Sequence, residues 1–104
     1  MIVRTWVAYA KPGNARAYRE HVRGSVLPAL KKRDGFLGLS LCEAERDGQV
    51  EIMVISRWES LDAIKAFAGG KVEKAVVDPG ARAVLAEFDD FATHYNVTVE
   101  AAKS

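Results

Sequence analysis

The stretch VEIMVISRWESLDAIKAF, residues 50–67, decides the fold because its pattern changes from that of a strand to that of a helix. Its first part is rich in apolar and β-branched residues and ends at Arg57 and Trp58, as a buried strand does. After Ser60, apolar residues recur at a spacing of three, which belongs to one helix face: Leu61, Ile64 and Phe67. The Ser60 hydroxyl can cap this helix. We therefore predict a buried strand that turns directly into an amphipathic helix.

Three further segments have the composition of strands. Residues 2–10 are rich in Val, Thr, Trp and Tyr, while residues 36–45 and 89–100 alternate between two sets of side chains. Residues 46–49 contain an Asp-Gly pair, which favours a tight hairpin between the second strand and residues 50–58. The sequence thus predicts four strands, of which the middle two form a hairpin.

The helical pattern between the first two strands is irregular. It begins after Asn14, which can act as its cap, and it is interrupted by Gly24 and Pro28. Proline lacks a backbone donor and disfavours helix at the preceding Leu27, so we expect a kink or break there.

Two short helical segments are predicted before the last strand, at residues 71–77 and residues 80–86. Asp78 followed by Pro79 is a cap and first-turn pair that starts the second segment. The resulting order, βαββαβ, predicts an α+β fold of the ferredoxin-like type with an antiparallel sheet. We expect residues 1–104 to form a single domain.

Two of the strands are apolar on both faces, whereas the helices suffice to cover only one face of the sheet. In the first strand the two faces carry Ile2, Trp6 and Ala8 on one side and Val3, Val7 and Tyr9 on the other. A second copy of the chain is the simplest cover for the remaining face. We therefore predict a homodimer whose sheet faces pack together as a dimeric α/β barrel.

The junction Trp58–Ala63 resembles the W-x-S-x-x-(A/D) junction of the antibiotic biosynthesis monooxygenase family. Residues 11–13 resemble the turn after the family's first strand, and residues 34–38 resemble its entry to the second. The resemblance covers nearly the whole chain. It implies a small dimeric α+β barrel and a monooxygenase that works without a cofactor on an electron-rich aromatic substrate.

Composition argues against several classes of partner and cofactor. The formal net charge is +1 without charge blocks, so a nucleic-acid or anionic-membrane partner is not expected. No apolar run is long enough to span a bilayer, and the N-terminal residues resemble a strand and not a signal peptide, so we expect a cytoplasmic protein. The sequence contains no dinucleotide fingerprint, and a zinc site is not expected from His21, His94 and Cys42 because they lie far apart.

Seven residues are candidates for a substrate site. Trp58 and Trp6 can stack on an aromatic ring, although core packing explains them equally well. His94 or His21 can accept a phenolic proton, because imidazole titrates near neutral pH, but a structural hydrogen bond is the alternative for each. Arg4, Tyr9 and Arg57 can anchor an anionic oxygen, with surface pairing as the alternative.

Some members of the family degrade haem with an asparagine, a tryptophan and an axial histidine. Only the tryptophan carries over, as Trp58. The asparagine position corresponds to Trp6, and the axial position falls at Val77 or Asp78. Without an imidazole there, iron lacks a proximal ligand, so the resemblance does not extend to haem degradation.

Two functions stay open at this point. The first is a cofactor-independent monooxygenase that oxidises a small phenolic, quinol-like or polyketide-like substrate with O₂. The second is a non-catalytic dimeric protein of the same fold that binds a small molecule or acts in a stress response. A closed pocket with His94 or His21 beside the tryptophans favours the enzyme, whereas a collapsed interior filled by side chains favours the second function.

Overall fold

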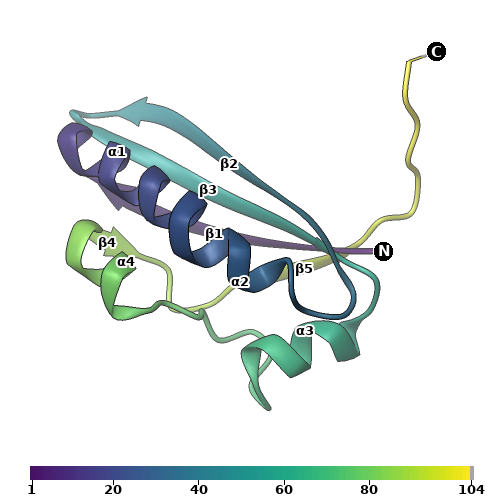
Figure 1. The fold of residues 1–104 in the computed structure, drawn as a ribbon. Coiled ribbons are helices and arrows are strands. Elements are labelled where there is room, and N and C mark those ends of the chain that lie inside the picture. Colours follow the sequence, from purple (N-terminus) through teal and green to yellow (C-terminus); the bar gives the residue numbers. More distant parts are fainter. Residues whose placement is uncertain (104) are drawn as a thin grey trace.

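The computed structural model describes residues 1–103 and contains one antiparallel sheet with helices on one of its faces (Figure 1). The strand order is β2-β3-β1-β4, and β5 also pairs with β1. This is the ferredoxin-like order, with the first and third strands at the centre, as the sequence predicts. The strands are β1 Ile2–Ala10, β2 Phe36–Arg46, β3 Gln49–Trp58, β4 Glu87–Phe88 and β5 Thr93–Asn96.

The predicted hairpin and the predicted junction after β3 are both confirmed. Asp47 and Gly48 have positive φ angles of 50° and 81°, which the tight turn between β2 and β3 requires. Ser60 caps helix α3, Leu61–Ala68, by accepting a hydrogen bond from the Ala63 backbone N–H at 3.1 Å.

The first helical region is continuous but changes type along its length. Helix α1 spans Pro12–His21, a π-helical segment spans Val22–Val26, and helix α2 spans Leu27–Leu30. The predicted irregularity is therefore a π segment ahead of Pro28 and not a break, because Leu27 keeps helical angles. The predicted cap at Asn14 is wrong. Proline at the first position starts the helix earlier, as its fixed φ angle favours.

The predicted helix at residues 71–77 is absent from the structure, which has a turn and an extended segment there. Backbone partners explain the difference: Ala75 N donates to Asp90 O at 2.9 Å, and Ala92 N donates to Glu73 O at 2.7 Å. The following helix, α4 at Pro79–Val84, is confirmed with Asp78 as its cap.

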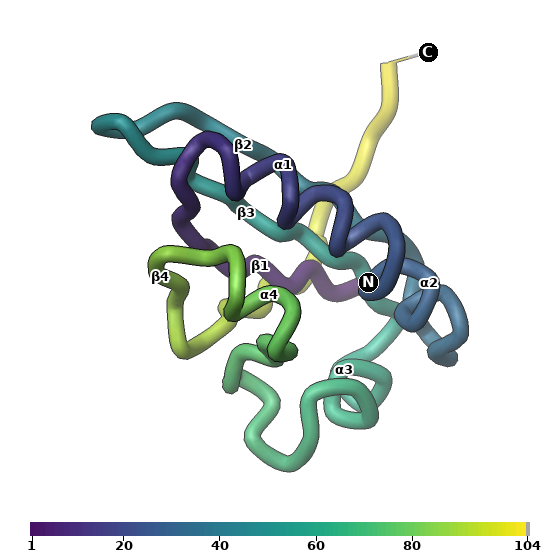
Figure 2. Tube along the Cα trace, turned by 60° about the vertical axis from the view of Figure 1, so that its left-hand side comes forward, coloured from purple at the N-terminus to yellow at the C-terminus, as the bar shows by residue number. Residues whose placement is uncertain are grey.

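The predicted last strand, 89–100, is shorter and interrupted. Residues 90–92 bend toward the 73–75 segment, which separates β4 from β5. Val97 N makes a final bond to Met1 O, just before β1 begins, and residues 98–103 have no neighbouring strand. They extend away from the body of the molecule as the yellow segment (Figure 2).

The two faces of the sheet differ in burial. On the face beneath the helices, which we call the covered face, Ala8, Ile52 and Trp58 are fully buried. Residues of the opposite, open face are half-buried: Val3, Val7, Tyr9, Met53 and Ile55. No helix within residues 1–103 is long and apolar enough to cross a membrane.

Candidate functional site

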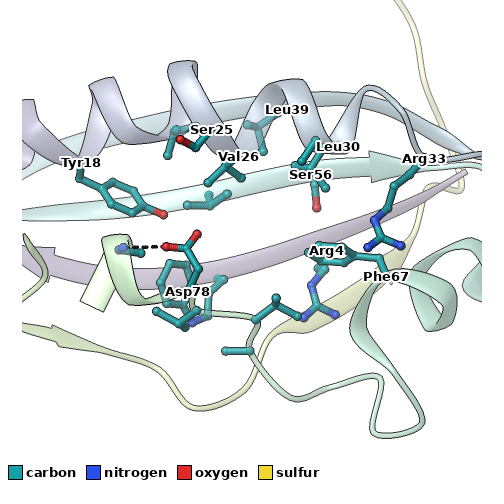
Figure 3. A pocket seen from close by; sticks show the side chains of 18 of the residues that line it. Arg4, Tyr18, Ser25, Val26, Leu30, Arg33, Leu39, Ser56, Phe67 and Asp78 are labelled. Carbon is teal, nitrogen blue, oxygen red and sulfur yellow. Dashed lines mark hydrogen bonds between the residues drawn. The ribbon is translucent and has the colours of Figure 1, made fainter. Parts of the chain in front are cut away.

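A pocket of about 240 Å³ lies between the covered face of the sheet and the α1–α2 helical region (Figure 3). The segment 75–78 forms its outer wall. The sheet contributes Arg4, Trp6, Leu39, Val54, Ser56 and Trp58 to its floor. The sequence-predicted residues Trp58, Trp6 and Arg4 are thus brought together in one pocket.

Arg4 is the buried cation of this pocket, with 6% of its surface exposed. One terminal nitrogen donates to Val72 O at 2.6 Å and to His94 Nε2 at 2.8 Å, and the other donates to Lys74 O at 2.9 Å. Burial lowers the pKa of Arg4, and the nearby Glu73 charge opposes that shift. These hydrogen bonds of Arg4, a β1 residue, connect the 72–74 segment and β5 to β1. The Arg4 side chain also lines the pocket, so its positive charge faces the cavity.

His94 lies behind Arg4 and outside the pocket lining. It faces Arg4 across the β1–β5 pair, and its Nε2 accepts from the guanidinium because arginine has only donors. Burial and the positive charge of Arg4 lower the pKa of His94, with Glu73 acting in the opposite direction. This histidine is therefore held as a neutral acceptor that positions Arg4.

Trp58 forms the buried aromatic end of the pocket. Its ring stacks on Phe67 at 5.4 Å between centroids and meets Phe36 edge-on at 5.3 Å. Its Nε1–H donates to Ser56 Oγ at 2.9 Å. One face of the indole is thus already covered by Phe67, so Trp58 supports the wall and holds Ser56 in place.

Trp6 lines the same pocket but is only half-buried. Its Nε1–H donates to Asp89 O at 2.6 Å, and its ring is tilted against Phe88 at 5.8 Å between centroids. Both contacts fix the orientation of the indole from the side of β4. Trp6 is therefore a fixed aromatic wall whose position depends on the turn after β4.

His21, Asp78 and Tyr18 gather at the end of the pocket opposite Arg4. His21 Nε2 lies 2.9 Å and 3.0 Å from the two Asp78 carboxylate oxygens, and Asp78 also accepts from the Ala81 backbone N–H. Asp78 and Tyr18 line the pocket, whereas His21 lies behind Asp78. The contact between His21 and Asp78 also joins the end of α1 to the start of α4.

Both lining groups at this end have shifted pKa values. Burial acts to raise the pKa of Asp78, but hydrogen bonds from the Ala81 backbone and from His21 outweigh it and hold this pKa below its usual value. Burial and the Asp78 charge raise the pKa of Tyr18 to about 12. The pocket end therefore combines a carboxylate acceptor with a neutral phenol.

Tyr9 and Arg57 do not reach the pocket, because they lie on the open face of the sheet. Tyr9 donates to Glu51 Oε1 at 3.3 Å, and the Glu51 charge together with burial raises the pKa of Tyr9. Arg57 donates to Ser40 Oγ at 3.1 Å. Within residues 1–103 no cluster of three or more metal-ligating side chains occurs.

Sequence reasoning did not single out four residues that line this pocket: Tyr18, Arg33, Phe67 and Asp78. Asp78 carried a signal only as a helix cap. Tyr18 and Phe67 carried a signal only as members of apolar helical stripes. Their shared position depends on how three helices and one extended segment pack together, which no local pattern contains.

Comparisons with known proteins agree on the fold. A family model described as antibiotic biosynthesis monooxygenase matches residues 1–92. The heme-degrader MhuD from Mycobacterium tuberculosis, with two hemes bound in its active site, has a TM-score of 0.62 at 22% identity, over 98% of this chain and 100% of that chain. A Streptomyces coelicolor monooxygenase from the gene ActVA-Orf6, in complex with nanaomycin D, has a TM-score of 0.67 at 18% identity, over 99% and 92% of the two chains.

A curated relative from Mycobacterium tuberculosis, an uncharacterized protein, is 34% identical over 68 residues. The match takes in 59% of this chain but only 30% of that relative, so the chain corresponds to less than a third of the relative's length.

Proposed function

Because the chain belongs to the antibiotic biosynthesis monooxygenase family, we propose that it is a cofactor-independent monooxygenase that oxidises a small aromatic, phenolic or quinol-like substrate with O₂. The observation that carries this proposal is the pocket that Arg4, Trp6 and Trp58 line together with Asp78 and Tyr18. It offers aromatic walls for a ring, a cation for an anionic oxygen and an acceptor for a hydroxyl proton.

In such a reaction the substrate supplies all the electrons. A ring hydroxyl loses its proton, the resulting anion reduces O₂, and a bond forms between a ring carbon and oxygen. For a substrate with a ring methylene, one oxygen atom becomes a ring carbonyl, and the other leaves as water with the two methylene hydrogens. For a quinol, one oxygen atom becomes a hydroxyl on the resulting quinone ring, and the other leaves as water with two hydrogens of the quinol. The protein then has three tasks: to bind the ring, to accept the hydroxyl proton and to stabilise the anion in a site that excludes water.

The Asp78–His21 pair is the best supported proton acceptor. Asp78 lines the pocket and is held by His21, whereas the Nε2 lone pair of His94 is already engaged by Arg4. The lowered pKa of Asp78 makes its carboxylate a weak base. The pair therefore suits a substrate whose hydroxyl is already acidified by the rest of the ring system.

The residues of this pocket do not fit a haem. Among the described residues that line it there is no histidine, cysteine or methionine, and the resemblance to haem-degrading family members puts their axial position at Val77 or Asp78. The phenol of Tyr18, with its pKa of about 12, is a poor ligand because it stays protonated. The cavity of about 240 Å³ also lies below the ~300–1,000 Å³ of pockets for drug-sized ligands.

We also propose a homodimer formed through the open faces of two sheets. The support is the row of half-buried apolar side chains on that face, which includes Val7, Met53 and Ile55. An uncovered apolar sheet face of this kind promotes association. The pocket lies on the other side of the sheet, so one copy suffices to line it.

Oxygen uptake by the purified protein tests the monooxygenase proposal. A panel of hydroquinones and anthrones is supplied without added cofactor, and O₂ consumption and hydrogen peroxide are measured together. We expect uptake of about one O₂ per substrate without peroxide, reduced at least about tenfold in Asp78→Asn. Uptake no faster than in buffer across the whole panel would reject the enzyme.

A non-catalytic binding protein is the second candidate, and one observation favours it: no histidine lines the pocket within residues 1–103. The same assay separates the two functions. Binding of panel members without oxygen uptake above the buffer rate would assign the pocket to ligand binding alone.

A further inference from the structure

We propose that the ligand of this pocket is a small aromatic hydroxy acid, bound with its carboxylate at Arg4 and its hydroxyl at Asp78. This inference rests on the proposed function in that it names the substrate class of the same pocket. It follows from the unequal charge of the two pocket ends, which lie apart in Figure 3.

Within residues 1–103 the cation at the first end has no carboxylate bonded to it, although the charge of Glu73 lies near enough to raise its pKa. Arg4 forms no ion pair with a carboxylate of residues 1–103, and its three hydrogen-bond acceptors are two carbonyl oxygens and an imidazole nitrogen. A buried charge that lacks a counterion is costly, so a site of this kind gains from an incoming anion. A guanidinium has five donors, of which three are engaged here, so donors remain for a carboxylate.

A second cation strengthens the same end. The guanidinium carbon of Arg33 lies 5.3 Å from the centre of the Phe67 ring, and that of Arg4 lies 5.9 Å from it. Figure 3 shows both arginines beside Phe67. Arg33 is exposed at the pocket edge and donates to Ala66 O, so it can attract an anion toward Arg4 as the ligand enters.

The opposite end has the reverse polarity. Asp78 and Tyr18 face this end in Figure 3, and the Asp78 carboxylate can accept a hydrogen bond from a ligand hydroxyl. A carboxylate ligand reversed in the pocket would meet the Asp78 charge, so the two ends fix one orientation. Apolar side chains separate the ends: Val26, Leu30, Leu39 and Val54. A flat ring matches this middle section, and the cavity of about 240 Å³ favours one or two fused rings over three.

Calorimetric titration with a matched pair of ligands tests the inference on the unaltered protein. We compare 6-hydroxy-2-naphthoic acid with 6-hydroxy-2-naphthamide, which has nearly the same shape without the charge. We expect the acid to bind at least about tenfold more tightly at pH 7, because hydrogen bonds to charged groups are the stronger ones. Equal or tighter binding of the amide would overturn the inference.

Two variants locate the preference. Arg4→Met should reduce the acid-over-amide ratio to about one, whereas Arg16→Met, an exposed arginine outside the pocket, should leave it unchanged. If Arg4→Met fails to fold, Arg4→Lys takes its place. This variant keeps a cation and should retain only part of the preference for the acid. An acid preference that is unaltered in Arg4→Lys and in Arg4→Met would place the anion elsewhere and overturn the inference.

Binding measured without oxygen separates this inference from the proposed reaction. An acid preference without oxygen uptake would reject the monooxygenase and keep the ligand class. Oxidation of neutral quinols with kcat/KM equal to that for the matched acids would keep the enzyme and reject the ligand class.

Discussion

The covered face and the open face of the β1–β3 pair are built from alternate residues of the same two strands, yet they differ in what they bury. On the covered face Ile52 and Trp58 are fully buried, and the polar Arg4 and Ser56 are buried beside them with hydrogen-bond partners. On the open face the neighbour Ile55 is only half-buried and the helices lie on the other side (Figure 1). Alternation therefore places the pocket on one face and a row of half-buried apolar side chains on the other.

A single lysine on the covered face should unfold the protein, whereas one on the open face should affect only association, and this is the largest expected difference between the two faces. Ile52→Lys buries an unpaired charge in the core and should remove most of a domain stability of ~5–15 kcal/mol. Ile55→Lys should leave the fold intact but weaken the proposed dimer at least about 100-fold, because the charge falls in an apolar interface. Circular dichroism measures folding, and light scattering measures the association state. A dimer that survives Ile55→Lys at micromolar concentration would show that the open face is not the interface.

High pH should destabilise the covered face through Tyr18. Its folded pKa of about 12 lies above the ordinary tyrosine pKa of 10.0, so the stabilisation is complete below pH 10 and is lost as the pH rises toward 12. The shift corresponds to a loss of about 2–3 kcal/mol near pH 12. Urea unfolding at pH 9 and pH 11.5 measures it, with Tyr18→Phe as the control that lacks the phenol. The same loss in both proteins would assign the effect to other groups.

The two tryptophans sharpen the comparison within the covered face. Trp58→Phe should cost ~1–2 kcal/mol of unfolding free energy, because the fully buried indole is stacked and hydrogen-bonded. Trp6→Phe should cost ~0.5–1.5 kcal/mol, mainly through the bond to Asp89 O. Since Phe67 already covers one face of Trp58, ligand affinity should fall more in Trp6→Phe. Chemical unfolding and calorimetry measure the two effects, and the reverse order of affinity loss would make Trp58 the ligand wall.

The smallest expected effect is at Asp78, at the edge of the covered face. Its folded pKa is lowered, so its stabilisation is present above the unfolded carboxyl pKa of ~3.9 and is lost as the pH falls through the lower folded value. Asp78→Asn keeps a helix cap but loses the charge, and should cost less than about 1 kcal/mol at pH 7 because the pair with His21 is partly exposed. Melting curves at pH 7 and pH 2.5 test this. A variant that is equally less stable at both values would point to lost packing.

Much of the fold could be predicted because its signals are local. The Asp-Gly turn, the Ser60 cap and the change of period after Trp58 each act through neighbouring residues, and all three are confirmed. The segment 71–77 could not be predicted in this way. Its carbonyls at Val72 and Lys74 bind Arg4, a residue nearly seventy positions earlier, and those bonds outweigh its helical pattern.

The residues of the site show the same difference between local signals and contacts of distant elements. Trp6, Trp58 and Arg4 carried signals of their own in strand positions, and they share the pocket. His21 and His94 were chosen for their chemistry, yet each is engaged by a neighbour, Asp78 or Arg4, and neither lines the cavity. Hydrogen bonds between distant elements decide which side-chain atoms face the pocket. The residue type alone therefore does not show whether a histidine lines it.

The π segment at Val22–Val26 makes the pocket tolerant of a change in chain length at this turn. The Leu27 N–H bonds to Val22 O, five residues earlier, so this turn holds one residue more than an α-helical turn. Deleting one residue here would restore a regular α-helical turn and keep the turns on either side in nearly the same orientation, because the extra residue is taken up within this turn. Tyr18 in α1 and Leu30 in α2 would therefore both keep their places in the pocket lining. Deleting one residue from the regular turns of α1 would instead rotate the turns before it by about 100° relative to Leu30.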